Sequence, residues 1–235
     1  MLQINKVTML YDKENGVRDI DIQINSGEII SFIGPNGAGK TTIVKCIAGL
    51  LEPQNGTILL DHCDVLERKS KFSIGYMQDD LRFYGNMTVY EVLHFVCQVK
   101  YNQKFQQEVD RFLHDYNLFE QRNQLVKKLS LGMKKKLSII MALLGNPSLI
   151  ILDEPTNGLD TFGILALKKH LKSFADTGAI IIVTSHVLDF VEKICKRCVF
   201  LVKGRIKEDF EIGNGSLEEK YEEIYSCEES LARPI

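Results

Sequence analysis

The sequence lacks any apolar run long enough to cross a lipid bilayer. Its first residues, 1–14, mix charged with apolar side chains and lack the uninterrupted apolar core of a signal peptide. We therefore expect a soluble, cytoplasmic protein with no direct membrane span, unless another protein holds it at a membrane.

The chain also lacks an excess of basic charge. Its 29 lysine and arginine residues are balanced by 31 aspartate and glutamate residues spread along the chain, which gives a formal net charge of −2. A dedicated nucleic-acid-binding domain normally concentrates positive charge on one face. We therefore expect no nucleic acid among the partners.

The six cysteines lack the repeated spacing of a disulfide framework. Cys195 and Cys198 form one CxxC pair, but no second pair or histidine partner follows at ligand spacing, so we expect reduced thiols and no zinc site.

What the chain does have is 235 residues of 45% hydrophobic composition, enough for one well-buried domain and hardly for two.

The first and last parts of the chain carry β-type runs. Early runs are separated by turn residues and lie at 2–8, 17–24, 28–33 and 56–60. Later apolar runs alternate with helical segments near 163–174 and 187–195, and lie at 148–152, 179–184 and 198–202. This alternation predicts an α/β fold with a parallel sheet covered by helices on both faces.

Helical spacing dominates the middle of the chain. It begins at Thr88 and Glu91, whose side chains can cap a helix reciprocally, and it continues to Leu144, which indicates a helical side lobe. A further helix, capped by Ser216 and Glu219, is predicted near the end. The tail 227–235 has no clear pattern, which is typical of a disordered end.

A glycine-rich loop, Gly34-Pro-Asn-Gly-Ala-Gly-Lys-Thr41, follows an apolar strand and precedes a helical segment. Its backbone N–H groups can surround phosphates, to which the following helix presents the positive end of its dipole. Lys40 supplies a charge for the β- and γ-phosphates, and the Thr41 hydroxyl can ligate Mg²⁺. We therefore predict a site for Mg-ATP whose loop residues are Asn36, Gly37, Ala38, Gly39, Lys40, Thr41 and Thr42.

Two carboxylates follow the apolar run 148–152. Because ligands bind at the carboxyl ends of parallel strands, we assign Asp153 to Mg²⁺ and Glu154 to polarising the attacking water. His186 follows the run 179–184, and we expect it to act at the γ-phosphate, although a histidine there could also be an ordinary surface residue.

Residues 129–133, Leu-Ser-Leu-Gly-Met, complete a pattern that resembles the ATP-binding cassette (ABC) family. The run resembles that family's signature motif, and it stands in the family's order with the phosphate loop, Asp153-Glu154, the turn 158–160 and His186. The resemblance covers the chain from Leu2 to about Tyr225. It implies a P-loop NTPase (RecA-like) core with an N-terminal antiparallel β subdomain and an inserted α-helical subdomain at about 80–145, all within one ATPase domain at 1–226.

The resemblance also implies a head-to-tail dimer. Each ATP would lie between the phosphate loop of one copy and Ser130 and Gly132 of the other, with Asp160 also at the nucleotide. The chain departs from the usual signature in having Leu131 for a glycine and Met133 for a glutamine, which leaves in question any polar contact made by the fifth residue. The lysines at 134–136 are expected to form a solvated helix face.

Two further residues are assigned through the resemblance. Tyr11 matches the aromatic residue that stacks on adenine, with a core tyrosine as the alternative. In the lid loop, position counting favours Asp79 and chemistry favours Gln78, because a neutral amide meets Mg²⁺ and water without adding charge. Both remain candidates, with Gln78 preferred as a catalytic and metal-contacting residue.

Within the family, the signature, the run 185–192 and the ending 203–205 resemble separate-subunit ATPases of bacterial exporters for peptides, antimicrobials or drugs. This resemblance implies a separate transmembrane permease that docks beside 79–100 and holds the ATPase at the cytoplasmic face of the membrane. One alternative is a soluble ABC-type ATPase acting on ribosomes or nucleic acid, which usually carries two cassettes or a long coiled coil. A P-loop kinase is a third reading, but it leaves the signature without a role.

Overall fold

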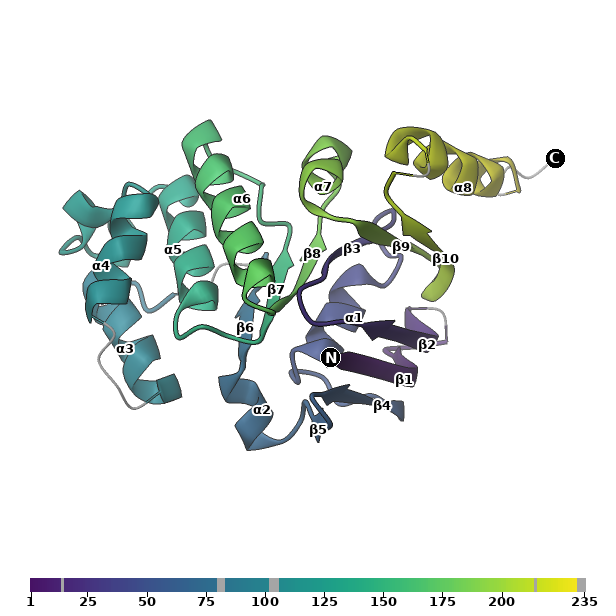
Figure 1. The fold of residues 1–235 in the computed structure, drawn as a ribbon, viewed down its shortest axis with the longest axis horizontal. Coiled ribbons are helices and arrows are strands. Elements are labelled where there is room, and N and C mark those ends of the chain that lie inside the picture. The colour runs from purple at the N-terminus through teal and green to yellow at the C-terminus, as the bar shows by residue number, and fades with distance from the viewer. Residues whose placement is uncertain (14, 80–82, 102–105, 214, 232–235) are drawn as a thin grey trace.

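The computed structural model describes residues 1–13, 15–79, 83–101, 106–213 and 215–231. Two sheets and their helices form a layered α/β architecture (Figure 1). The smaller sheet is antiparallel, has the order β2-β1-β4-β5, and consists of Leu2–Leu10 (β1), Gly16–Ile24 (β2), Asn55–Leu60 (β4) and Cys63–Asp64 (β5).

The central sheet has six strands in the order β10-β9-β3-β8-β7-β6. Its strands are Ile29–Ile33 (β3), Ile74–Met77 (β6), Leu149–Asp153 (β7), Ile180–Thr184 (β8), Arg197–Val202 (β9) and Arg205–Glu211 (β10). The pairings from β9 to β6 are parallel, as the sequence predicts, whereas β10 is antiparallel to β9. The sheet is therefore mixed, because Lys203 and Gly204 both have positive φ (47° and 77°) and form a tight turn of the kind that joins antiparallel neighbours.

Both faces of the central sheet are buried, which explains why its strands are continuously apolar. Along β7, Ile150 and Leu152 belong to the cluster shared with the helices of one face, and Ile151 belongs to the cluster shared with the antiparallel sheet and α1 (Lys40–Ile47). The other helices are Arg68–Phe72 (α2), Val89–Tyr101 (α3), Gln106–Asp115 (α4), Leu131–Leu143 (α5), Thr161–Asp176 (α6), Leu188–Ile194 (α7) and Leu217–Leu231 (α8), with short 3₁₀ turns at Phe119–Gln121 and Val126–Lys128.

Helices α3, α4 and α5 lie together at one end of the molecule, within the range expected for the helical subdomain (Figure 1). Residues 80–82, where that subdomain was expected to begin, lie outside the described residues. The predicted reciprocal cap is confirmed: the Thr88 N–H donates to Glu91 Oε2 (2.7 Å), and the Glu91 N–H donates to Thr88 Oγ1 (3.2 Å). In the part of the chain that the structure describes, no helix has both the length and the apolarity needed to cross a membrane.

The C-terminal helix is longer than expected. Its cap at Ser216 is confirmed, because Ser216 Oγ accepts the Glu219 N–H at 3.4 Å. The helix then continues to Leu231, past the boundary expected at Cys227, and residues 232–235 lie outside the described residues.

The expectation of a solvated lysine face at 134–136 is wrong for two of the three lysines. Lys135 and Lys136 are buried. Each ammonium lies beside a carboxylate, Lys135 Nζ at 2.9 Å from Asp79 and Lys136 Nζ at 2.8 Å from Asp160. Helical spacing alone did not reveal this burial, because both carboxylates come from loops distant in the sequence.

Helix α5 lies unusually close to the edge strand β6. A Cβ added at Gly75 in β6 would lie 1.9 Å from the carbonyl oxygen of Ala142 in α5. No side chain larger than hydrogen fits there unless the helix moves away.

We expect Gly75→Ala to lower the free energy of unfolding by about 1–3 kcal/mol, because α5 must shift to accommodate a methyl group. Urea unfolding followed by circular dichroism measures this change. Gly85→Ala is the control, since the nearest atom to its added Cβ would be Lys127 Cβ, at 3.2 Å, and we expect a change below about 1 kcal/mol. Equal stability of the two variants would contradict the close approach of α5.

Candidate functional site

A cavity of about 290 Å³ opens at the carboxyl ends of the central strands. Residues from the phosphate loop, the antiparallel sheet and the end of β7 contribute to its wall. The lining residues are Tyr11, Asn15, Gly16, Asn36, Gly37, Gly39, Lys40, Thr41, Thr42, Asp79, Asp153 and Glu154.

The phosphate loop joins β3 to α1 in a conformation that requires glycine. Gly37 and Gly39 have φ values of 83° and 103°, in the left-handed region. A Cβ at Gly39, the N-cap of α1, would also lie 2.9 Å from the Gly16 carbonyl oxygen. The loop can therefore pass close to the antiparallel sheet while its backbone N–H groups and the start of α1 face the cavity.

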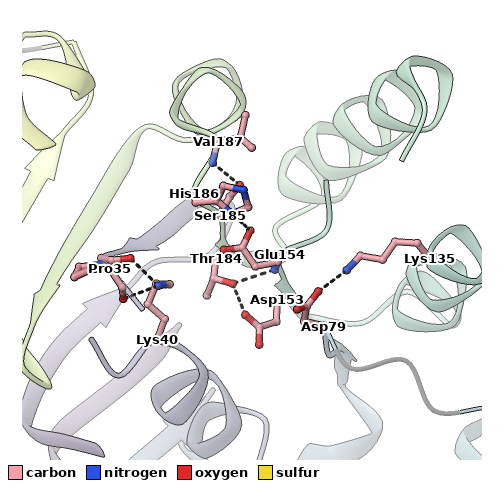
Figure 2. Close-up of polar contacts among 11 residues, drawn as sticks. Pro35, Lys40, Asp79, Lys135, Asp153, Glu154, Thr184, Ser185, His186 and Val187 are labelled. Carbon is pink, nitrogen blue, oxygen red and sulfur yellow. Dashed lines mark hydrogen bonds and ion pairs between the residues drawn. The ribbon is translucent and has the colours of Figure 1, made fainter. Parts of the chain in front are cut away.

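Lys40 is the first residue of α1, and its ammonium bends back toward the loop. Its Nζ donates to the carbonyl oxygen of Gly34 at 2.6 Å and to that of Pro35 at 3.0 Å (Figure 2 labels Lys40 and Pro35). Burial lowers the pKa of Lys40, and the nearby carboxylates of Glu154 and Asp153 partly oppose that effect. Lys40 thus supplies a cation to a cavity whose other charged lining side chains are acidic.

Asp153 is the buried last residue of β7, and two hydroxyl groups orient its carboxylate. Thr41 Oγ1 donates to Oδ2 at 3.3 Å, and Thr184 Oγ1 donates to Oδ1. Thr184 occupies the register position next to Asp153 in the parallel strand β8. Sequence reasoning missed Thr184, although a polar residue that ends an apolar strand beside the predicted site was an available signal.

Thr41 and Asp153 offer the hydroxyl and carboxylate oxygens that Mg²⁺ prefers in nucleotide sites. Among the described residues, no group of three or more histidine, cysteine, aspartate or glutamate side chains could hold a metal. A donor pair of this kind fits Mg²⁺, which takes few protein ligands and uses water and substrate phosphates for the remainder.

Glu154 has an uncommon backbone conformation, with φ of 48°. Its N–H donates to both the carbonyl oxygen (3.0 Å) and Oγ1 (3.1 Å) of Thr184, which holds the strained turn in place. Its Oε2 lies 2.9 Å from Nδ1 of His186, whose side chain is 65% exposed (Figure 2). Burial raises the pKa of Glu154, and His186, followed by Lys40, opposes that rise.

The predicted site residues divide into two groups. Most of the loop residues line the cavity together with Tyr11, Asp153 and Glu154. Ala38 is buried, and His186 contacts the site through Glu154. In the lid loop, Asp79 lines the cavity and Gln78 does not. Also absent from the described lining are Ser130, Gly132 and Asp160.

Ser130, Gly132 and Asp160 lie close to the N-terminal ends of α5 and α6. Exposed Ser130 caps α5, and its Oγ accepts the Met133 N–H at 3.3 Å. Gly132 packs against the turn before α6, since a Cβ there would lie 2.8 Å from the Gly158 carbonyl oxygen. Asp160 caps α6 by accepting the Gly163 N–H at 2.7 Å.

Comparisons with known proteins agree with this geometry. Residues 17–157 match the family described as ABC transporter. The chain is 33% identical over 222 residues to the lantibiotic transport ATP-binding protein SrtF of Streptococcus pyogenes, covering 94% of this chain and 96% of that protein. It is 28% identical over 212 residues to the lipopolysaccharide export system ATP-binding protein LptB of Escherichia coli, covering 87% and 88% of the two chains.

Solved structures show the same fold. An ATP-binding subunit of an ABC transporter superposes with a TM-score of 0.88 at 29% identity, covering 96% of this chain and 99% of that one. A dimeric ATP-binding cassette in a post-hydrolysis state with ADP and Pi superposes with a TM-score of 0.80 at 22% identity, covering 92% and 100%. The antiparallel sheet, the helical insert and the phosphate-loop core are therefore those of a cassette, and the chain belongs to the ABC transporter family as an ATP-binding, ATP-hydrolysing cassette.

Proposed function

We propose that this chain is the motor subunit of an exporter, in which two copies close head to tail around two Mg-ATP and drive a separate transmembrane subunit. The observation that carries the proposal is the division of the site residues. One chain brings Lys40, Asp153 and Glu154 to its cavity, whereas the exposed Ser130 and the neighbouring Gly132 lie outside it. A second copy, placed head to tail, supplies the missing side of the site.

The cavity suits ATP along its length. Tyr11 stands exposed at the rim, where its ring can stack on adenine, and the phosphate loop surrounds the triphosphate with N–H groups. Thr41 and Asp153 would hold Mg²⁺, which when bound neutralises the phosphate charge and polarises the phosphoryl group. Lys40 then exchanges a loop carbonyl for a phosphate oxygen, because an ammonium favours the more negative acceptor.

Hydrolysis is assigned to Glu154 and His186. The Glu154 carboxylate stands in the cavity and can orient and polarise water for in-line attack. His186 orients that carboxylate through its 2.9 Å contact and keeps more of it ionised, because it opposes the rise in the Glu154 pKa. Since His186 is also exposed, it can reach the γ-phosphate directly.

Glu154→Gln tests the water-positioning role. We expect it to keep ATP binding, to slow hydrolysis by about 100-fold or more, and to trap a dimer, because the amide has the shape of the carboxylate without its basicity. Phosphate release gives the rate, and size-exclusion chromatography with Mg-ATP detects the dimer. Glu218→Gln, at an exposed position on α8, is the matched control. Near-normal turnover of Glu154→Gln would remove Glu154 from this role.

The pH dependence of hydrolysis tests the link between His186 and Glu154. Because the active form is the carboxylate and its pKa is raised, we expect kcat to fall as pH drops through a range above that of an ordinary glutamate. His186→Ala removes the main effect that opposes this rise, so the acid limb should move to higher pH while kcat falls by about 100-fold or more. The measurement is kcat against pH at saturating Mg-ATP. An unmoved acid limb would show that His186 does not tune Glu154.

The proposed docking surface for the membrane partner is a groove of about 720 Å³ along α3. Its lining consists of Asn86, Met87, Glu91, His94, Phe95, Gln98 and Gln106. Phe95 is 48% exposed, and its ring meets that of Tyr84, which is 72% exposed, in an edge-to-face contact. Exposed aromatic rings next to polar side chains suit an amphipathic cytoplasmic segment of a permease.

The exporter assignment rests on the relatives. One is named for lantibiotic transport and another for lipopolysaccharide export, so transport is common to both and the second name supports export as its direction. From the resemblance of the signature to exporter ATPases, we infer that the cargo class is peptides, antimicrobials or drugs. The permease, not this chain, would contact the cargo.

Affinity purification tests the partner. A tagged chain, extracted in detergent from its native host, should retain an integral membrane protein, and Phe95→Asp should lose it because a carboxylate in the groove opposes apolar docking. Leu165→Asp, an equally drastic change at an exposed position on α6, should retain the partner. Recovery of ribosomes or nucleic acid in place of a membrane protein would instead favour a soluble ATPase that acts as a mechanical switch.

A further inference from the structure

A buried lysine of helix α5 forms an ion pair with an exposed aspartate at the wall of the nucleotide cavity. Lys135 Nζ lies 2.9 Å from Oδ1 of Asp79, and the two side chains are 3% and 56% exposed (Figure 2). We propose that Lys135 is a positioning residue that neutralises Asp79, so that an acidic side chain can serve as the lid-loop residue facing the anionic nucleotide. The inference rests on the proposed function for the identity of the ligand.

Asp79 belongs to the nucleotide site by its place in the sheet. It follows β6, whose last residue, Met77, pairs with Leu152 in the parallel strand β7. The segments that follow the two strands therefore emerge at the same edge, and Asp79 lines the cavity together with Asp153 and Glu154. Gln78, the neutral alternative, is absent from the described lining.

Three carboxylates around one cavity create an electrostatic problem. Each repels the others and a triphosphate, and the effect is largest where water is excluded. Lys40 lies on the phosphate-loop side of the cavity and interacts electrostatically with Glu154 and Asp153. Asp79 instead forms its ion pair with Lys135, on the opposite side. With its charge compensated, Asp79 presents a hydrogen-bond acceptor at little electrostatic cost.

The pair is asymmetric, which makes it testable. Lys135 is buried and would be left as an uncompensated charge without Asp79, whereas Asp79 is more than half exposed and would remain solvated without Lys135. Methionine preserves most of the buried lysine stem, so Lys135→Met should fold while leaving an unneutralised carboxylate at the cavity.

The same helix makes a second pair, between Lys136 and Asp160 (2.8 Å), and presents Ser130 and Gly132 at its N-terminus. The lid loop and the turn before α6 are therefore both tied by ion pairs to the helix that begins at the signature.

The test is ATP binding by the full chain, measured by calorimetry in a Glu154→Gln background so that no turnover occurs. In EDTA and low salt, Lys135→Met should weaken ATP binding about three- to tenfold, because it leaves a partly screened like charge at the site. The loss should shrink in high salt, and Lys135→Arg should bind ATP as the parent does.

A double variant separates charge from structure. Adding Asp79→Asn to Lys135→Met removes the repelling carboxylate and should restore ATP affinity to within about twofold of the parent. Lys134→Met, at the neighbouring and more exposed lysine, is the control and should bind ATP as the parent does. Unfolding in urea verifies that every variant is folded.

The opposing outcomes are distinct. Unchanged ATP affinity in Lys135→Met, a loss that is independent of salt, or a double variant as weak as the single one would overturn the role of Lys135. Failure of the proposed function appears elsewhere, as a Glu154→Gln parent that stays monomeric with Mg-ATP, and leaves the binding comparison in EDTA decisive for the ion pair.

Discussion

The parallel pairing of β6, β7, β8 and β3 is the constraint on which the whole site depends. Because these strands run in one direction, their carboxyl ends meet at one edge of the sheet. The phosphate loop follows β3, the metal-binding candidate Asp153 ends β7 with the catalytic candidate Glu154 directly after it, and His186 follows β8. A shift of one residue in the register between β7 and β8 would separate Thr184 from Asp153 and release the strained turn at Glu154.

Charge balance is the second organising feature of the cavity. A site for triphosphate must be cationic, yet this one is lined by Asp79, Asp153 and Glu154. Cations reach it from two directions, Lys40 from the phosphate loop and Lys135 from α5. In the proposed roles, Asp153 holds a metal and Glu154 orients water, while Lys135 compensates the charge of the third carboxylate, Asp79.

Helix α5 is held by contacts near both of its ends. Near its C-terminal end it approaches β6 so closely that only glycine fits at position 75, and near its N-terminal end it is tied to two loops by ion pairs. In the proposed dimer, α5 would connect the lid loop beside the nucleotide to the surface that carries Ser130 and faces the second copy.

The sequence by itself determined the fold class, the family and the elements that carry the phosphate loop and the Asp153-Glu154 pair, since each is a contiguous pattern whose chemistry follows from neighbouring residues. The roles of individual residues remain predictions. Only the tertiary structure decided that Thr184 orients Asp153, that Asp79 lines the cavity where Gln78 was preferred, that Lys135 and Lys136 are buried, and that β10 turns the sheet into a mixed one. The first three of these features depend on contacts between segments far apart in the chain, which strand register and helix packing set. The antiparallel pairing of β10 depends on the backbone conformation of a two-residue turn. Neither kind of feature leaves a periodic signal in the sequence.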